Sequence, residues 1–254
     1  MLAQDQHDRI DVVLVSPRNP LNIGAAARAM ANFGFSRLTV VAPYAPHWRE
    51  ARSAIGAPEL LHNAKETESL AEAVTDCTLV IGTGTLTYRK PEQCVVPLPG
   101  LAAPVEREMR RCGQVALVFG PEKHGLTRVD LSHCHLFVEI PTDVHQPSMN
   151  LGQAVAVCLY ELTARGFPIE DGTEAHARPI AAKASDRRTA ISNDLELLAG
   201  IVEQVMEAAK YSPAAMKEAN RHDLRLLLRR LAPTEKDSRR ILGLFRRILW
   251  RLKR

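Results

Sequence analysis

Five polar side chains in three stretches of the chain have the chemistry to bind an anion and to control charge: Asn22, Arg28, Glu122, Ser148 and Asn150. Arginine stays protonated at neutral pH because its pKa lies above about 12. It therefore suits a phosphate, or the negative charge that develops on an attacking hydroxyl oxygen. Amide, hydroxyl and carboxylate groups make the hydrogen bonds that hold such a centre in place.

Each of these stretches follows an apolar run that predicts a buried strand, and each leads into a helical pattern or a turn. Asn22, and either Ser148 or Asn150, are candidates to cap the helices that begin there. Loops between strand ends and helix starts form the usual binding edge of an open α/β sheet. The predicted strands cover residues 11–16, 38–41, 77–81, 115–119 and 134–140, and the predicted helices cover 22–34, 66–74, 100–112 and 151–162. This alternation predicts a mainly parallel sheet with helices on both faces.

A change in sequence character near residues 166–185 predicts a domain boundary. Glycine, proline and mixed polar residues interrupt the hydrophobic periodicity there, and only helical patterns follow. Apolar residues then recur at helical spacing in about three segments, each with a basic opposite face. We expect an α/β domain at residues 1–168 and a small all-α domain that binds RNA at residues 169–254.

Charge is distributed unequally along the chain. Residues 1–171 contain 15 Lys and Arg against 19 Asp and Glu, whereas residues 172–254 contain 18 against 10, so the net charges are −4 and +8. The stretch 221–254 alone carries +9. A basic end of this kind predicts a polyanionic partner, most simply a nucleic acid; a solvated helix face with a basic terminus is the alternative. The candidate contacts are Arg225, Arg229, Arg230, Arg239, Arg240, Arg246 and Arg247.

Composition disfavours membrane, disulfide, metal and nicotinamide proteins. No apolar run approaches the roughly 18 residues of a membrane span, and the polar N-terminus is unlike a signal peptide, so we expect a cytoplasmic protein. The five cysteines are widely spaced without a CxxC pair, which supports neither a zinc site nor a disulfide framework. His133, Cys134 and His135 are consecutive, and three consecutive strand residues cannot all face one ion, so we expect no metal. The Gly82–Gly84 pair lacks the third glycine of a dinucleotide fingerprint.

Three motifs occur together in the first 165 residues. They are NPLNIGAAARAM at 19–30, VFGPEKHGL at 118–126, and IP at 140–141 followed by PSMNL at 147–151. In this order and spacing they resemble the three motifs of the SpoU, or TrmH, family of RNA ribose 2′-O-methyltransferases, in the SPOUT superfamily. The resemblance covers about residues 10–165. The first motif and the helical C-terminal extension are most similar to the TrmJ branch, which modifies tRNA.

The resemblance implies features that periodicity and spacing do not reveal. It implies a deep trefoil knot in the C-terminal part of the sheet, S-adenosylmethionine as the cofactor, and a homodimer with the site near the interface. It makes Arg28 the catalytic arginine and assigns Asn22, Glu122, Ser148 and Asn150 to the same catalytic site. It places the cofactor against Gly120, Ile140, Met149 and Leu151, with Thr83 and Gly84 in the loop at a strand end.

The role of Arg28 and the identity of the RNA have alternatives. The family proposal makes this arginine a general base, whereas the high pKa of arginine favours holding a phosphate and stabilising a developing alkoxide. His124 and His145 are alternative bases by residue type. By the TrmJ resemblance, the target is the anticodon loop of tRNA near position 32. The alternatives are the same reaction on ribosomal RNA, or an RNA-binding module without turnover.

Overall fold

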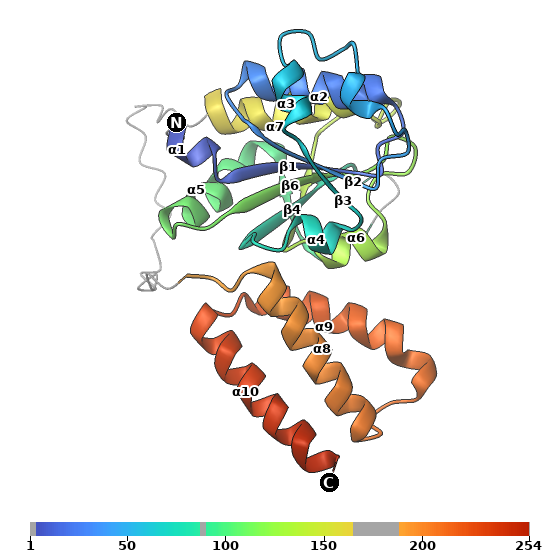
Figure 1. Ribbon diagram of the computed structural model, residues 1–254, viewed down its shortest axis with the longest axis vertical. Helices are drawn as coiled ribbons and strands as arrows, with labels where there is room; N and C mark the ends of the chain where they lie inside the picture. Colours follow the sequence, from blue (N-terminus) through green and yellow to red (C-terminus); the bar gives the residue numbers. More distant parts are fainter. Residues whose placement is uncertain (1–3, 87–89, 165–187, 254) are drawn as a thin grey trace.

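The residues described by the structure form one parallel sheet of seven strands. The structure is a computed structural model, and it describes residues 4–86, 90–164 and 188–253 (Figure 1). The strands are β1 (Ile10–Val15), β2 (Arg37–Val41), β3 (Lys65–Thr67), β4 (Leu79–Gly84), β5 (Cys94–Pro97), β6 (Val115–Phe119) and β7 (Leu136–Glu139). Their order is β3-β2-β1-β6-β4-β7-β5, and each neighbouring pair runs parallel. The predicted mainly parallel sheet is confirmed.

Helices cover both faces of this sheet, as the alternating pattern predicts. The α-helices are α1 (Gln4–His7), α2 (Pro20–Asn32), α3 (Pro58–His62), α4 (Leu70–Ala73), α5 (Ala102–Arg110), α6 (Arg128–Ser132), α7 (Leu151–Ala164), α8 (Ser192–Ala208), α9 (Lys217–Leu231) and α10 (Glu235–Leu252). Short 3₁₀ helices are η1 (Trp48–Glu50), η2 (Leu98–Gly100) and η3 (Ala214–Met216). Helices α2, α5 and α7 bury apolar residues on one face of the sheet, and α4 and α6 do so on the other.

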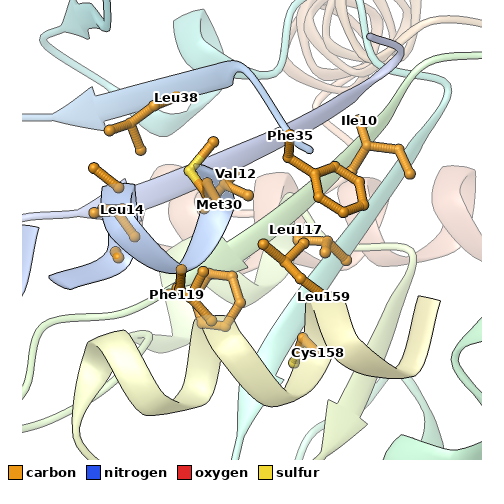
Figure 2. Packing of buried hydrophobic residues seen from close by; sticks show 14 of the residues in the cluster. Ile10, Val12, Leu14, Met30, Phe35, Leu38, Leu117, Phe119, Cys158 and Leu159 are labelled. Carbon is orange, nitrogen blue, oxygen red and sulfur yellow. The ribbon is translucent and has the colours of Figure 1, made fainter. Parts of the chain in front are cut away.

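Strand β1 shows how the sequence builds a core on each side. Its apolar residues alternate, so that Val12 and Leu14 join the core under α2 and α7 while Val13 joins the core under α4 and α6. Figure 2 shows the first of these cores, where Met30 of α2 and Leu159 of α7 meet the strand residues. A strand that is buried on both faces belongs in the middle of a parallel sheet, which is where β1 lies.

Two strands are absent from the sequence prediction. The predicted helix at 66–74 is wrong in its first part, because residues 65–67 pair with β2 as strand β3 and only 70–73 are helical. Edge strand β5 lies between the predicted strand at 77–81 and the predicted helix at 100–112, where the sequence predicts no element. Both strands are short and partly exposed, so they lack the apolar run that marks a buried strand.

Helices α8, α9 and α10 form a separate cluster around their own apolar core, which confirms a helical C-terminal region. The predicted boundary at 166–185 lies outside the described residues. The helices lie beneath the sheet in Figure 1 and contact the segment that leads into β4. The backbone N–H and the hydroxyl of Ser192, at the start of α8, both donate to the carbonyl of Cys77, at 2.9 and 3.0 Å. The trefoil knot stays a prediction. Nowhere in the described chain is a helix both long and apolar enough to cross a membrane.

Candidate ligand pocket and catalytic site

A pocket of about 400 Å³ opens at the carboxyl ends of β6, β4 and β7, which are neighbours in the sheet. Its walls come from three segments far apart in the sequence: the end of β4, the loop after β6, and the loop between β7 and α7. The ends of parallel strands expose backbone groups at one edge, so loops that follow them converge there. The pocket therefore lies at the edge that the sequence predicts.

All the residues expected to contact a cofactor line this pocket. They are Thr83, Gly84, Gly120, Ile140, Met149 and Leu151, and Glu122 and Ser148 line it with them. One expectation is wrong in detail, because Thr83 and Gly84 are the last residues of strand β4 and not part of a loop. The hydroxyl of Thr83 donates to the carbonyl of Val118 in neighbouring β6 at 2.9 Å. This bond fixes the floor of the pocket to the middle of the sheet.

Gly120 allows the loop after β6 to fold back tightly on itself. A Cβ atom at this position would lie 2.2 Å from the backbone nitrogen of Leu126 and 2.3 Å from the carbonyl carbon of Gly125. The turn is closed by the Gly125 N–H, which donates to the carbonyl of Pro121 at 2.7 Å, and Gly125 has φ of +58°. Glycine is therefore required here by the loop itself, before any ligand is considered.

A chain of side-chain hydrogen bonds joins the three motifs beside the pocket. The amide of Asn22 donates to Glu122 at 2.7 Å, and the amide of Asn150 donates to the side-chain oxygen of Asn22 at 2.9 Å. The side-chain oxygen of Asn150 in turn accepts the backbone N–H of Gly152 at 2.9 Å. Three of the five predicted catalytic-site residues therefore meet directly, one from each motif.

Glu122 collects hydrogen-bond donors from the first motif. Its carboxylate accepts the backbone N–H groups of Arg18 at 3.1 Å and Asn19 at 3.2 Å in addition to the amide of Asn22. Burial by itself would raise the pKa of Glu122, but these bonds stabilise the charged form and lower the pKa below its ordinary value. Glu122 is therefore an ionised acceptor at neutral pH, and it anchors the loop between β1 and α2.

Of the two predicted helix caps, the one at α7 is confirmed and the one at α2 is wrong. Asn22 does not cap α2; Asn19 does, since its side-chain oxygen accepts the N–H of Leu21 at 3.0 Å and Pro20 follows as the first helical residue. This shift of the cap frees the Asn22 side chain for Glu122. At α7, Asn150 and not Ser148 bonds to the first turn. Ser148 instead lines the pocket and is exposed to solvent.

Arg28 is not among the residues that line the pocket. It lies on the exposed face of α2, and within the described chain its guanidinium has neither a hydrogen bond nor an ion pair. Leu21 on the same helix and Tyr160 on the adjacent α7 are each 54% exposed. A single chain therefore leaves this arginine outside the site that the motifs build.

The two histidines proposed as bases differ in position. His124 lines the pocket, whereas His145 lies in the exposed loop before α7, with its N–H bonded to Asp143 at 2.8 Å. Sequence reasoning missed Thr142 and Ala154, which also line the pocket. Ala154 lies one helical turn after Leu151, so helical spacing alone could have indicated it.

The consecutive His133, Cys134 and His135 have protein partners. The ring nitrogen Nδ1 of His135 accepts the N–H of Val80 at 3.0 Å, and the thiol of Cys134 lies 3.6 Å from the carbonyl of Asp130. In the part of the chain that the structure describes, no group of three His, Cys, Asp or Glu side chains is arranged to hold a metal ion.

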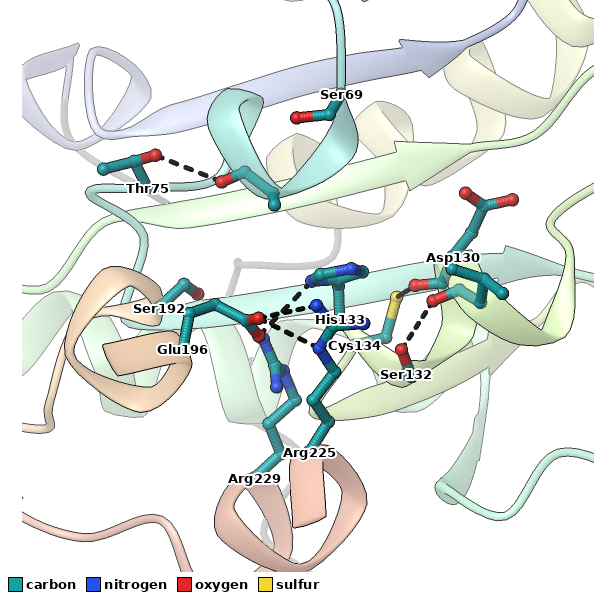
Figure 3. A network of polar contacts seen from close by, with 12 residues as sticks. Ser69, Thr75, Asp130, Ser132, His133, Cys134, Ser192, Glu196, Arg225 and Arg229 are labelled. Atoms are coloured by element: carbon teal, nitrogen blue, oxygen red, sulfur yellow. Dashed lines mark hydrogen bonds and ion pairs between the residues drawn. The ribbon is translucent and has the colours of Figure 1, made fainter. Parts of the chain in front are cut away.

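Two of the arginines expected to contact RNA, half-buried Arg225 and buried Arg229, are held in ion pairs within the helical region. Figure 3 shows Glu196 of α8 held by Arg225 and Arg229 of α9, at 2.8 and 3.0 Å, with His133 at 3.6 Å. The side chain of Arg229 is only 1% exposed. The assignment of Arg229 to RNA binding is therefore wrong, because its side chain is buried, and Arg225 is committed to the same half-buried carboxylate.

Helix α10 presents most of the remaining candidate arginines to solvent, and Arg230 is exposed near the end of α9. Its buried side contributes Leu249, and Ile241 and Leu242 pack against the helical core. Its exposed basic residues are Lys236, Arg239, Arg240, Arg246, Arg247 and Arg251. The guanidinium of Arg247 lies 4.8 Å from the ring centre of Trp250 on the same surface. A stripe of cations beside an exposed aromatic ring has the composition of a nucleic-acid contact.

Comparison with known proteins agrees with the motifs. Residues 9–160 match the model of the SpoU rRNA Methylase family. The chain is 41% identical over 167 residues to the tRNA (cytidine/uridine/adenosine-2′-O-)-methyltransferase TrmJ of Pseudomonas aeruginosa, an alignment that covers 63% of this chain and 65% of that protein. It is 30% identical over 240 residues to the tRNA (cytidine/uridine-2′-O-)-methyltransferase TrmJ of Sodalis glossinidius, which covers 92% of this chain and 89% of the relative.

A solved structure extends the similarity through the helical region. The crystal structure of TrmJ from Z. mobilis ZM4 superposes with a TM-score of 0.78 at 28% identity, covering 94% of this chain and 98% of that one. The family predicted from the three motifs is thus confirmed by sequence and by fold. The chain belongs to the SpoU methylase family of SPOUT methyltransferases.

Proposed function

We propose that this protein transfers a methyl group from S-adenosylmethionine to a ribose 2′-hydroxyl of tRNA. The observation that carries this proposal is the hydrogen-bonded chain Glu122–Asn22–Asn150, which ties the three family motifs together at one pocket. The TrmJ relatives named above are tRNA 2′-O-methyltransferases and support tRNA as the substrate. By the same resemblance the target lies in the anticodon loop near position 32, and the reaction takes place in the cytoplasm.

The pocket fits the cofactor in size and chemistry. A volume of about 400 Å³ lies in the range of small-molecule sites, and its lining combines apolar side chains with strand-end backbone. Ile140, Met149 and Leu151 would pack against the adenosine part, and the backbone at Gly84 and Gly120 would approach it closely. When bound, S-adenosylmethionine supplies an electrophilic methyl group on a sulfonium, whose departure as a neutral thioether needs no acid.

The residues of this chain then position the hydroxyl and manage its charge. Ser148, exposed at the pocket, is placed to orient the incoming ribose. Arg28 holds a phosphate and stabilises the oxygen as negative charge develops on it. Because alignment of reacting groups lowers the barrier strongly, the rigid Asn22–Glu122 bond contributes by holding the first motif in place.

A homodimer accounts for the position of Arg28. In one chain Arg28 lies outside the pocket, on a face of α2 that also exposes Leu21 and adjoins Tyr160 of α7. Apolar side chains that are half exposed on adjacent helices suit burial against a second copy. We place the subunit interface on this face, so that each Arg28 completes the pocket of the partner chain.

The helical region provides RNA affinity through α10. The part of the chain that holds the pocket carries −4 over residues 1–171, which does not favour a phosphate backbone. The exposed arginines of α10 supply the compensating charge. Arg225 and Arg229 serve instead to hold α9 against α8 through Glu196.

Mapping of 2′-O-methylated riboses in total RNA, from cells with and without this protein, tests the proposal. We expect one tRNA ribose to lose its methyl group when the protein is absent and to regain it with purified protein and cofactor. Loss confined to ribosomal RNA would favour the ribosomal alternative. Unchanged RNA, together with RNA binding but no cofactor binding in titration, would favour the module without turnover.

A further inference from the structure

An arginine and a tyrosine form an exposed pair beside the catalytic site. The guanidinium of Arg18 lies over the ring of Tyr44, 5.6 Å from the ring centre. The tyrosine is 77% exposed, and Arg18 is exposed as well. Among the described residues no carboxylate pairs with Arg18, so its charge remains available to a ligand.

The backbone holds this pair at the pocket edge of the sheet. Ser16 and Ala42, which follow the neighbouring strands β1 and β2, have φ of +45° and +43°, a conformation that costs energy in residues other than glycine. These turns bring the two loops together, and the Tyr44 N–H donates to the carbonyl of Pro17 at 3.2 Å. Strained backbone at two adjacent strand ends is maintained where a surface has a specific use.

Arg18 is also connected directly to the catalytic motifs. Its backbone N–H donates to Glu122, which lines the pocket and bonds to Asn22. Movement of the Arg18–Tyr44 pair therefore requires movement of a loop that Glu122 anchors. The pair is therefore held at a fixed position relative to the pocket.

We propose that the Arg18–Tyr44 pair binds the RNA nucleotide adjacent to the methylated ribose, with its base stacked on Tyr44 and a phosphate held by Arg18. An aromatic ring accepts any base by stacking, and a neighbouring cation neutralises the backbone charge. The net charge of −4 over residues 1–171 makes a local cation necessary here. This inference rests on the proposed function, since it requires an RNA substrate.

Steady-state kinetics on the preferred tRNA, with the full chain, tests the pair. Tyr44→Ala should raise KM for tRNA about tenfold, the loss expected when one base is no longer stacked, with kcat and cofactor affinity little changed. Tyr44→Phe should restore the wild-type KM because the ring is kept. Arg18→Gln should flatten the slope of log affinity against log salt by about 0.7, the increment for one single-strand phosphate, and Arg18→Lys should not. Tyr211→Ala removes a tyrosine of similar exposure, 75%, and should have no effect.

An RNA hairpin with an abasic nucleotide beside the target ribose isolates the stacking contact. The KM of the wild-type protein should be about tenfold higher for the abasic hairpin than for the intact hairpin. Tyr44→Ala should show no further increase on the abasic hairpin, because the two changes remove one interaction. A further increase of the same size when Tyr44→Ala acts on the abasic hairpin would overturn the proposal. A change in the sedimentation of Tyr44→Ala would overturn it too, because it would identify Tyr44 as a subunit contact. Absence of methyl transfer by the wild-type protein to any RNA would refute the proposed function instead, which keeps the two failures distinct.

Discussion

The side chain of Asn22 donates a hydrogen bond of 2.7 Å to Glu122, which lies 100 residues further along the chain. The same asparagine accepts the amide of Asn150 at 2.9 Å. A single residue thus connects the first turn of α2, the loop after β6 and the start of α7. The bond gives the three family motifs one shared geometry, and the predictions on catalysis follow from it.

Glu122→Gln should loosen the site while leaving the fold in place. The carboxylate now accepts from Arg18, Asn19 and Asn22, whereas a glutamine offers one oxygen and turns an NH₂ toward the remaining donors. We expect about 1 kcal/mol of lost stability and at least about a tenfold loss of methyl transfer. Urea unfolding and a radiolabelled methyl assay measure the two effects. Glu106→Gln, on the solvent side of α5, is the control, and equal losses in both variants would refute a specific role for Glu122.

Arg28→Ala should keep the fold and the cofactor affinity, because the residue is exposed and lies outside the pocket. It should still remove most turnover, because the charge that stabilises the attacking oxygen is lost. Mixing this variant with Ala154→Trp, which fills the pocket, tests where the arginine acts. If Arg28 completes the partner's site, random mixed dimers regain about a quarter of wild-type activity, since half of the dimers carry one intact site. No recovery after mixing, in dimers shown to exchange subunits, would place Arg28 in the site of its own chain.

Gly120→Ala should destabilise the protein even without cofactor. The added Cβ would lie 2.2 Å from the nitrogen of Leu126, so the loop that carries Glu122 must shift. We expect a cost of about 1–3 kcal/mol in unfolding free energy and weaker S-adenosylmethionine binding by calorimetry. Gly200→Ala is the control, because a Cβ there meets nothing within 4 Å. Wild-type stability with weakened binding would show instead that the glycine serves only the ligand.

Reversal of charge on α10 should weaken tRNA binding selectively. Arg240 and Arg247 are exposed and lie two turns apart on one face. The double variant Arg240→Glu/Arg247→Glu should lose at least about tenfold in tRNA affinity and flatten the log-log salt slope by about two. Cofactor affinity should not change. Arg110→Glu, an exposed arginine on α5, is the matched control, and wild-type affinity across the salt series in the double variant would exclude α10 from the RNA contact.

Acid should destabilise the contact between the helical region and the sheet. Burial, with the neighbouring Arg225 and Arg229, lowers the pKa of His133 to about 4 despite the opposing charge of Glu196. Unfolded His133 takes up a proton near pH 6.5, so between pH 6.5 and 4 the unfolded state binds more protons and stability falls as pH falls. At pH 5 this effect of His133 lowers the free energy of unfolding by about 2 kcal/mol.

Urea unfolding of wild type and His133→Gln at pH 7, 6 and 5 measures this effect. The variant should lose stability more gradually over that interval, although it starts lower at pH 7. Exposed His145→Gln should follow the wild-type slope. An unchanged slope in His133→Gln would assign the acid sensitivity to other groups, of which buried His135, with its pKa lowered to about 3, is the first to test.

The sequence predicted the elements with continuous apolar runs and missed those without them. Strands such as β1 and β6 are buried on both faces, and their composition shows it. Edge strands β3 and β5 contain charged or proline residues and become strands only by pairing with β2 and β7. Strand pairing depends on the neighbouring strand, so it leaves no signal in the sequence of the edge strand itself.

In the site, too, the sequence predicted what has a local signal and missed what depends on distant contacts. The family resemblance named eight residues that line the pocket, because its motifs lie at strand ends that meet at one edge of the sheet. Spacing assigned the cap of α2 to Asn22, whereas the structure gives that role to Asn19 and leaves Asn22 for Glu122. The role of Asn22 is decided by Glu122, a hydrogen-bond partner from a distant part of the chain.

The sequence by itself determined the α/β alternation, the three motifs, and the charge of each part, since these depend on residue type and on spacing over a few residues. The tertiary structure decided which charges are available. Arg229 and Arg240 are alike in sequence context, yet the first is buried against Glu196 and the second is exposed on α10. A guanidinium remains buried only where a carboxylate compensates its lost hydration, and that compensation comes from a helix 33 residues earlier, brought into contact by packing.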